Sequence, residues 1–456
     1  MNTKYLAVAA TLGMLMLVLA LLGLVTEQPA LAQPADVSGS SAEISVCPAG
    51  PPDCDYVVIQ DAVNAAIPGD TITVYPGTYV ENVIVDKDHL TIQSQSGAPS
   101  TIVHAAYSGE AAFSITAEYV SIRGFTVGNN TADCDIMFGG VVVGGAHAVI
   151  SDNTVTGNCK GIVLHASHIT VTRNTISDNR AYVASDGIYI WPSCTNISII
   201  DNDISNNMDE GIQQEFGGRH TLIDGNDISD NGGEGIYLGT SDSDLPEEYL
   251  DALLFSHDFR IQNNRISSSG ENGVYLGTLL RGSEILSNTI RLNQQNGIKF
   301  GGEAVTYYQF GQPIGTISSG ENEIRANNIL TNAIAGVFCT ACEDNWIGLN
   351  NFRANGDNAN SPVSDNFWRT RRTITYTYQG NAFEGYLGNY WDDYAEAVGH
   401  DPVDLDPHDG IADDPYRIDD DEQEHDHHPL MSRFESYFPE QVEYRVYLPI
   451  VLKAGE

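Results

Sequence analysis

A short repeated pattern through the middle of this chain constrains its fold more than any other feature. Each copy reads as a short apolar strand, an Asn, one residue, an Ile, a polar turn, and then a polar residue before Gly-Ile or Gly-Val; residues 186–235 hold two copies. A unit of about 20–30 residues cannot bury its own apolar face, whereas stacked copies can. The repeat therefore predicts a solenoid with one coil per copy.

The turn positions of this pattern recur along the chain. The first Asn stands at Asn153, Asn174, Asn202, Asn226, Asn264, Asn288, Asn328 and Asn351, the second at Asn158, Asn179, Asn207, Asn231 and Asn293, and the closing Gly at Gly161, Gly187, Gly211, Gly235, Gly273, Gly297 and Gly336. We expect the Asn residues to accept left-handed turn geometry and to hydrogen-bond from coil to coil. Two longer gaps require insertions, over 241–257 and 302–318.

The N-terminal segment predicts export. An apolar run from Leu6 to Val25 is followed by Ala30-Leu31-Ala32, an A-x-A cleavage pattern, so residues 1–32 read as a signal peptide; the alternative is a retained membrane anchor. After cleavage we expect a secreted, cell-surface or periplasmic protein that is not integral to a membrane. The chain has 61 acids against 21 bases, a net charge of −40, which would repel nucleic acid.

The remaining segments divide by composition. Residues 33–67 form a lead-in ending in a short amphipathic helix that would cap the solenoid, 68–352 hold the repeats, 353–440 form an acidic C-terminal cap, and 441–456 are a final strand or tail. Seven cysteines are compatible with disulfides in an exported protein. Cys47 with Cys54, Cys134 with Cys159, and Cys339 with Cys342 are the plausible local pairs, which leaves Cys194 over.

A polar and aromatic patch accompanies the repeat. Acids precede the closing Gly at Asp186, Glu210 and Glu234, and Asp209 stands one residue earlier. The neighbouring outward positions are Tyr189, Trp191, Gln213, Glu215, Tyr237, Tyr275 and Lys299. Coils lie about 4.8 Å apart, so carboxylates on adjacent coils could share a cation or act as a glycosidic acid/base pair. Aromatic rings suit the apolar face of a sugar, although acids at a solvated turn are an equally simple interpretation.

Segments at the start and at the end of the predicted solenoid resemble known families. GDTITVYPGTY at the start of the repeats looks like the opening of extracellular right-handed parallel β-helix proteins; GNYWDDY (388–394), HDGIADDPY (408–416) and DHHPLM (426–431) resemble the closing segment of NosD-like proteins. The resemblance implies an all-β, single-stranded right-handed parallel β-helix. NosD proteins are associated with copper-site maturation of nitrous oxide reductase.

The same C-terminal region holds two candidate metal sites. Asp404, Asp406, Asp409 and Asp413 form an oxygen-rich loop that suits Ca²⁺. His425, His427 and His428 could bind a softer ion such as copper.

The acid patch resembles polygalacturonases in part. SDGI places Asp186 on their acid, and MDEGI places Asp209 and Glu210 on their paired acids. Glu234 stands where they carry a catalytic His, and no Arg-x-Lys segment completes the set. The sequence therefore favours a protein that binds an extracellular polysaccharide along one face of the solenoid. The alternatives are a hydrolase or lyase acting on uronate-rich glycans and a periplasmic copper-binding or maturation protein.

Overall fold

The computed structural model describes residues 42–438 apart from short gaps at 108, 129–133, 135–138, 181–183, 216, 240–255, 278–279, 302–304, 310–311, 318, 341, 363, 406–407 and 419–423. The predicted signal peptide and the C-terminal tail lie outside these residues. Nearly all of the first insertion, over 241–257, also lies outside the described residues. In the part of the chain that is described, no helix is long and apolar enough to cross a membrane.

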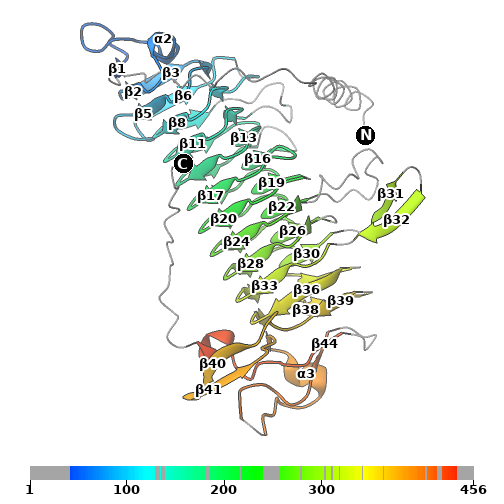
Figure 1. The fold of residues 1–456 in the computed structure, drawn as a ribbon. Coiled ribbons are helices and arrows are strands. Elements are labelled where there is room, and N and C mark those ends of the chain that lie inside the picture. Colours follow the sequence, from blue (N-terminus) through cyan, green and yellow to red (C-terminus); the bar gives the residue numbers. More distant parts are fainter. Residues whose placement is uncertain are drawn as a thin grey trace, which may run out of the picture. The chain divides into compact units, whose positions relative to one another are not determined.

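The repeats form a right-handed parallel β-solenoid of about 11 turns, as the sequence predicted (Figure 1). Each turn contributes one short strand to sheet A, then one to sheet B, then one to sheet C, and each strand pairs in parallel with the strand one coil on. Parallel pairing continues past residue 352, the predicted end of the solenoid, as far as strand β42.

The strands of sheet A are β1 (Glu43–Val46), β2 (Thr71–Val74), β5 (Thr91–Ser94), β8 (Ser121–Arg123), β11 (Val149–Ser151), β14 (Thr170–Thr172), β17 (Ser198–Ile200), β20 (Leu222–Asp224), β24 (Arg260–Gln262), β28 (Glu284–Leu286), β33 (Glu323–Arg325), β36 (Glu343–Gly348) and β39 (Asp365–Phe367). The strands of sheet B are β3 (Gly77–Val80), β6 (Thr101–His104), β9 (Thr126–Gly128), β12 (Thr154–Thr156), β15 (Thr175–Ser177), β18 (Asp203–Ser205), β21 (Asp227–Ser229), β25 (Arg265–Ser267), β29 (Thr289–Arg291), β34 (Asn328–Leu330), β37 (Asn351–Arg353) and β42 (Tyr390–Trp391).

The strands of sheet C are β4 (Val83–Val85), β7 (Phe113–Ile115), β10 (Val141–Val143), β13 (Ile162–Leu164), β16 (Ile188–Ile190), β19 (Ile212–Gln214), β22 (Ile236–Leu238), β26 (Val274–Leu276), β30 (Ile298–Phe300), β35 (Ala335–Phe338) and β38 (Asp357–Asn360). Outside the sheets, β23 (Ser256–His257) pairs with β27 (Leu280–Arg281), and three hairpins form from β31 (Val305–Gln309) and β32 (Gln312–Ile317), β40 (Ile374–Tyr378) and β41 (Asn381–Gly385), and β43 (Tyr416–Arg417) and β44 (His425–Asp426). The helices are α2 (Ile59–Ala65), α3 (Tyr394–Val398) and the 3₁₀ helix η2 (Phe434–Tyr437).

The core is a column of branched apolar side chains, one from the middle of most strands. In sheet A, for example, Ile150, Val171 and Ile199 lie on consecutive coils and are fully buried. Burying such a side chain stabilises the fold by roughly 1.5–3 kcal/mol relative to leaving it exposed. The amphipathic helix expected near residue 60 is α2, which buries Ile59 and Val63 in the same core.

An Asn ladder runs along the corner that precedes sheet B. Each side-chain amide donates to the Oδ1 of the next Asn at 2.9–3.1 Å, along Asn153, Asn174, Asn202, Asn226, Asn264, Asn288, Asn327, Asn350 and Asn389. In the doublets Asn327-Asn328 and Asn350-Asn351, spacing alone selected Asn328 and Asn351, but the ladder uses the residue before each. The residue with left-handed geometry is the one before the ladder Asn and not, as the sequence had predicted, the Asn itself; examples are Arg173 and Asp201 (both φ 54°).

Three disulfides link the cysteine pairs considered plausible from the sequence, Cys47–Cys54, Cys134–Cys159 and Cys339–Cys342. Cys194 is free and buried. Burial raises the pKa of its thiol to about 11, so it remains protonated and acts as a small apolar side chain.

Candidate functional site on the outer face of sheet C

The polar and aromatic patch of the sequence lies on sheet C. Tyr189, Gln213, Tyr237, Tyr275 and Lys299 face one another in register on β16, β19, β22, β26 and β30. The alternation of a strand then points their neighbours, such as Ile188 and Ile212, into the core, where both are fully buried. The structure confirms the register that the Gly-Ile repeat predicted.

The closing Gly residues hold the acids of adjacent coils together. The amide of Gly187 donates to the carbonyl of Glu210, and that of Gly211 donates to the carbonyl of Glu234. A Cβ on Gly187 would lie 2.6 Å from the carbonyl oxygen of Gly211, closer than any side chain could tolerate. Glycine is therefore required for the coils to approach, and the residue before it projects beside its counterpart on the next coil.

A buried ion pair begins the acid column. The Lys160 amine contacts the Asp186 carboxylate, and both side chains are almost completely buried. The same amine donates to the backbone carbonyl of Ala184 and lies 4.6 Å from the centre of the Tyr189 ring. Lys160 stands before Gly161, where the next copies of the repeat carry an acid, and the structure makes it the counter-charge of Asp186.

Three carboxyl groups converge beside this pair. One oxygen each from Asp186, Asp209 and Glu210 lies within 4.8 Å of the others. The buried Asp186 Oδ1 and Glu210 Oε2 have no hydrogen-bond partner among the described residues. Burial and the Asp186 charge raise the pKa of Glu210 to about 11, and burial also raises the pKa of Asp209. At neutral pH Glu210 therefore carries a proton that it can donate to Asp186.

Glu234 is the next acid along the column. It is buried, and Asn272 Nδ2 donates to its Oε1 at 3.2 Å. Burial, followed by the charge of Glu271, raises the pKa of Glu234 to about 7. This carboxyl group therefore exists in both protonation states near neutral pH, which is the condition for a general acid or base.

The aromatic side chains of the face form two layers. Tyr189 and Tyr275 are only 3% and 6% exposed, although both point outward from the strand. Tyr189 is covered by the Lys160 amine and the edge of Trp191, and Tyr275 stacks on Tyr237 with ring centres 4.9 Å apart and planes 3° apart. The partly exposed Trp191 and Tyr237 are therefore the accessible rings, and the buried tyrosines hold them in place.

Polar side chains border these rings. Glu215 is partly exposed. Burial raises the pKa of its carboxyl group, and a hydrogen bond from Tyr189 offsets part of that rise. Lys299 lies 5.7 Å from the centre of the Tyr275 ring. Gln213, between Tyr189 and Tyr237 in the register, is also partly exposed. The face thus offers hydrogen-bond donors and acceptors on consecutive coils.

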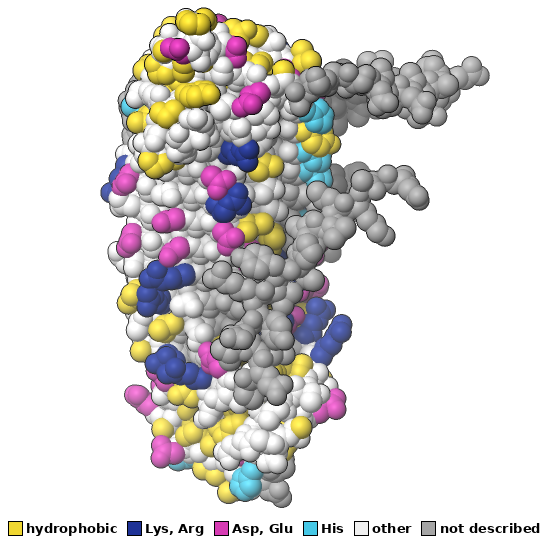
Figure 2. All heavy atoms as spheres, turned by 90° about the vertical axis from the view of Figure 1, so that its left-hand side faces the viewer, with side chains coloured by type: hydrophobic (Ala, Val, Ile, Leu, Met, Phe, Trp, Pro, Cys, Tyr) yellow, Lys and Arg dark blue, Asp and Glu magenta, His cyan; other side chains and the backbone are white. Residues whose placement is uncertain are grey.

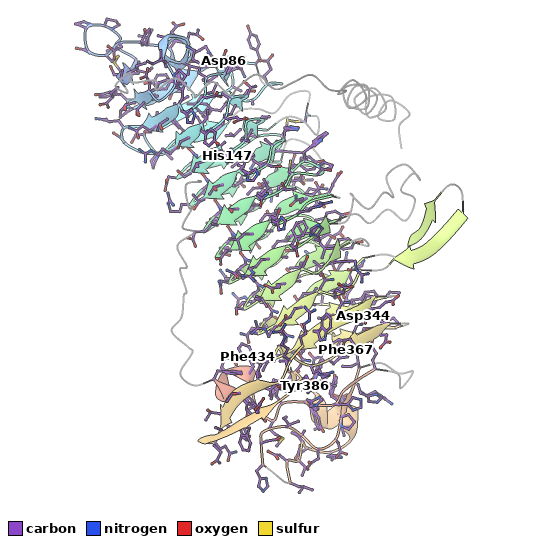
Figure 3. The ribbon with its side chains drawn as sticks, viewed as in Figure 1. Asp86, His147, Asp344, Phe367, Tyr386 and Phe434 are labelled. Atoms are coloured by element: carbon purple, nitrogen blue, oxygen red, sulfur yellow. A yellow bond between two sulfur atoms is a disulfide. The ribbon has the colours of Figure 1, made fainter. Side chains whose placement is uncertain are left out.

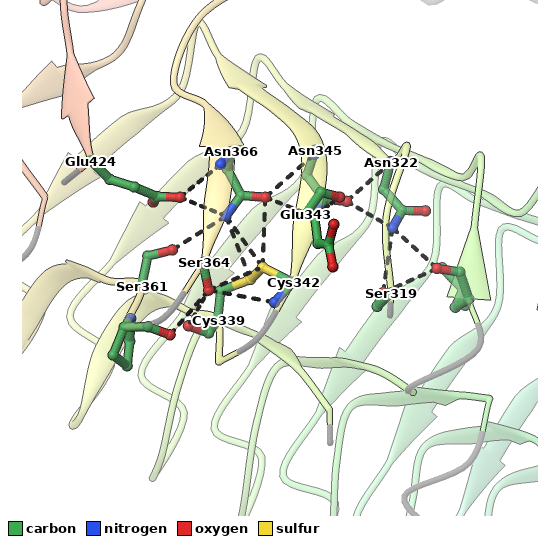
Figure 4. Close-up of a disulfide and its surroundings, with 12 residues drawn as sticks. Ser319, Asn322, Cys339, Cys342, Glu343, Asn345, Ser361, Ser364, Asn366 and Glu424 are labelled. Carbon is green, nitrogen blue, oxygen red and sulfur yellow. Dashed lines mark hydrogen bonds between the residues drawn. A yellow bond between two sulfur atoms is a disulfide. The ribbon is translucent and has the colours of Figure 1, made fainter. Parts of the chain in front are cut away.

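The C-terminal acids have structural partners. The Asn ladder at the corner that precedes sheet B ends at Asp426. Its Oδ2 accepts hydrogen bonds from the Asn389 backbone amide at 2.7 Å and from Trp391 Nε1 at 3.0 Å. A second ladder, at the corner that precedes sheet A, ends where Glu424 accepts from the Asn366 amide at 2.7 Å, beside the Cys339–Cys342 disulfide (Figure 4). A carboxylate suits these ends because it only accepts hydrogen bonds.

The predicted C-terminal metal residues are placed as follows. The ring centres of His425 and His427 lie 5.6 Å apart, and Asp426 stands between the two residues in the chain. The His428 ring packs against Tyr386, a residue that is labelled in Figure 3. Asp404 accepts from the Gly410 amide at 2.8 Å and Asp413 from the Leu405 amide at 2.9 Å.

Asp409 accepts from the Ile411 amide at 3.0 Å, and burial raises its pKa. Asp406 lies outside the described residues. These oxygens thus serve the turns of their own loop, and the calcium hypothesis stays a prediction.

Comparison with known proteins identifies the family. The model of the family described as "Periplasmic copper-binding protein (NosD)" matches residues 63–245 and 251–396. This chain belongs to the NosD family. No curated protein sequence matches it significantly.

Three solved structures are similar to this NosD chain, and the first of them reaches a TM-score of 0.50. The A-module of a mannuronan C-5 epimerase from Azotobacter vinelandii is 16% identical, with 67% of this chain and 92% of that chain covered and a TM-score of 0.50. The pectate lyase Pel9A is 15% identical over 65% of this chain and 77% of its own, with a TM-score of 0.45. An α-1,3-glucanase from Streptomyces thermodiastaticus is 15% identical over 68% of this chain and 64% of its own, with a TM-score of 0.46.

The copper named in the NosD description requires soft or borderline ligands. Among the described residues, two groups of three metal-ligating side chains converge within 4.8 Å: Asp186, Asp209 and Glu210, and His220, His257 and Asp258. The first group offers only carboxyl oxygens and already holds a lysine and a proton. The second offers two imidazoles and fits copper or zinc. Sequence reasoning missed it because His220 and His257 are separated by an insertion.

Proposed function

We propose that this NosD-family protein binds a glycan chain along the outer face of sheet C. The observation that carries the proposal is the register of the face, which places Trp191 and Tyr237 as accessible rings over a buried tyrosine layer. An aromatic face packs against the apolar face of a sugar ring, and a ring already held by its neighbours loses little conformational freedom on binding.

The length of the face supports a polymeric ligand. Trp191 follows β16 and Lys299 lies on β30, four coils further along sheet C. With about 4.8 Å between coils, these positions span roughly 19 Å. That distance accommodates several sugar units, and the polar residues between them, Gln213 and Glu215, supply donors and acceptors for hydroxyl groups.

The charge of the face favours a neutral glycan. Lys160 is already paired with Asp186, so it is not free to bind a uronate. Glu234 adds negative charge in its ionised form, and the whole chain carries a net charge of −40. A polyanionic glycan would be repelled at long range, whereas a neutral polysaccharide would not.

The proposal is tested by affinity electrophoresis through gels that contain neutral polysaccharides or polyuronates. We expect a neutral glycan to retard the protein at both low and high salt. Trp191→Ala combined with Tyr237→Ala should abolish the retardation, and Tyr107→Ala, at a tyrosine that is 72% exposed elsewhere, should not change it. Equal retardation of all three proteins would refute binding at sheet C.

A second candidate function is polysaccharide cleavage, which the position of Glu234 favours. Glu234 directly precedes the turn into β22, the strand that carries Tyr237, and burial raises its pKa to about 7. Release of new reducing or unsaturated ends, lost in Glu234→Gln, would establish an enzyme. Retention without turnover supports a binding protein. Export through residues 1–32 stays a prediction.

A further inference from the structure

The corner that precedes sheet A carries a column of exposed side chains. The residue two positions before the strand has positive φ on consecutive coils from β5 to β33, at His89, Tyr119, His147, His168, Asn196, His220, Asp258, Gly282 and Glu321. Histidine, Asn and Asp tolerate this left-handed geometry better than most residues do. One backbone conformation therefore projects these side chains side by side along the solenoid.

The upper part of the column is a stack of rings. Successive ring centres lie 4.6 Å apart from His89 to Tyr119, 4.5 Å from Tyr119 to His147 and 4.8 Å from His147 to His168. Figure 2 shows histidines gathered along one edge of the solenoid, and Figure 3 labels His147. The ring planes differ by at most 22°, so the nitrogen lone pairs lie in nearly parallel planes and cannot meet at one ion.

The arrangement changes at His220. The insertion before β23 brings His257 beside it, and the His220 amide donates to the His257 carbonyl at 3.3 Å. The two imidazole planes are now 82° apart. Asp258 lies between the rings, with its Oδ2 3.4 Å from His220 Nε2 and 2.6 Å from His257 Nδ1. Edge-to-face rings around a shared carboxylate oxygen direct both nitrogens toward one region.

We propose that His220, His257 and Asp258 bind a borderline divalent transition-metal ion, with Cu²⁺ or Zn²⁺ as the fitting class. Two imidazoles and one carboxylate are the ligand types that these ions accept, and three protein ligands leave a position open. A hard ion such as Ca²⁺ requires six or more oxygen ligands, and this group offers one carboxylate. Tolerance of positive φ is enough to account for the residue types at His220 and Asp258. It does not account for a histidine at position 257, which belongs to strand β23.

The location of the group suits exchange of the ion with solvent. The side chains of His220, His257 and Asp258 are 56%, 33% and 52% exposed, so an ion can enter without unfolding the coil. The group lies before sheet A, whereas the proposed glycan face belongs to sheet C. The metal proposal is therefore independent of the glycan proposal.

The test is titration of the full chain with Cu²⁺ or Zn²⁺, followed by calorimetry, and by electron paramagnetic resonance for Cu²⁺. In the test variant, His220→Asn preserves tolerance of the positive φ and His257→Gln preserves a polar side chain in the strand. The matched control is His147→Asn with His168→Asn, which removes two exposed histidines from the same column. Circular dichroism confirms that both variants fold.

We expect one tight ion per chain, nitrogen hyperfine splitting from imidazole, and an affinity at least tenfold lower in the His220 and His257 variant. The His147 and His168 control should bind as the wild type does, and Ca²⁺ should not compete. Unchanged affinity in the test variant, or an equal loss in the control, would overturn the proposal. Loss only on replacing His425, His427 and His428 would place the ion in the C-terminal cap instead.

Discussion

Asp426→Asn should change how the stability of the protein depends on pH. Asp426 is fully buried at the end of the Asn ladder, with hydrogen bonds from Asn389, Trp391 and the His428 amide. Burial outweighs these bonds and raises the pKa of Asp426 from 3.8 to about 7. An asparagine would continue the ladder by one step and keep a side-chain oxygen facing Asn389, without any charge to bury.

The sign follows from proton binding. Between pH 4 and 7 the folded protein holds a proton on Asp426 that the unfolded chain has released, so the folded state loses relative stability as the pH rises through this window. The difference between 3.8 and about 7 is close to 3 pH units, or about 4 kcal/mol at 1.36 kcal/mol per unit. Above pH 7 the carboxyl group is ionised in both states and the loss stays constant.

The measurement is urea unfolding of wild type and variant from pH 4 to pH 8, followed by tryptophan fluorescence, because Trp391 reports on this corner directly. Wild type should lose about 4 kcal/mol of unfolding free energy between pH 4 and pH 7 that the variant does not lose. The unfolding free energy of the variant minus that of wild type should therefore rise by the same amount. Asp365→Asn, at an exposed position on β39, should give a much smaller change. A flat difference for Asp426→Asn, or one that falls with pH, would refute a raised pKa.

Three further predictions test the ladder and the site. Asn327→Ala should lower the free energy of unfolding by about 3 kcal/mol because buried ladder partners lose their hydrogen bonds, whereas Asn328→Ala should lower it by about 1 kcal/mol. Similar losses for both variants in denaturant titrations would contradict a ladder role specific to Asn327. Lys160→Met should destabilise the protein by about 3–5 kcal/mol by leaving Asp186 unpaired, and adding Asp186→Asn should restore at least half of the loss in thermal unfolding. Because ionised Glu234 is the stronger acceptor for a sugar hydroxyl, glycan affinity should rise as the pH passes through 7, and Glu234→Gln should abolish this step in calorimetric titrations.

The repeat predicted the fold because two local rules determine it. Alternation within each strand sets which residues face the core, and Gly before Ile permits neighbouring coils to approach. These rules placed Tyr237 beside Tyr275 and Asp186 beside Glu210 correctly. They could not choose between Asn327 and Asn328, because both members of a doublet satisfy the spacing and only the position of the left-handed residue decides.

Contacts between distant segments were beyond sequence reasoning. The burial of Tyr189 depends on the Lys160 amine, which reaches it from the preceding coil. No pattern in the sequence pointed to Glu424 or Asp426, which terminate Asn ladders that approach from earlier coils. His220 meets His257 only because the chain returns to the same corner after an insertion of irregular length.

The central claim, that a glycan lies on the outer face of sheet C, is tested most directly by hydroxyl-radical footprinting with and without saturating neutral polysaccharide. Trp191 and Tyr237 should become protected from oxidation, while Tyr107 and Tyr119, which are 72% and 47% exposed away from this face, should react as before. Unchanged reactivity of Trp191 and Tyr237 with the glycan bound would contradict the claim.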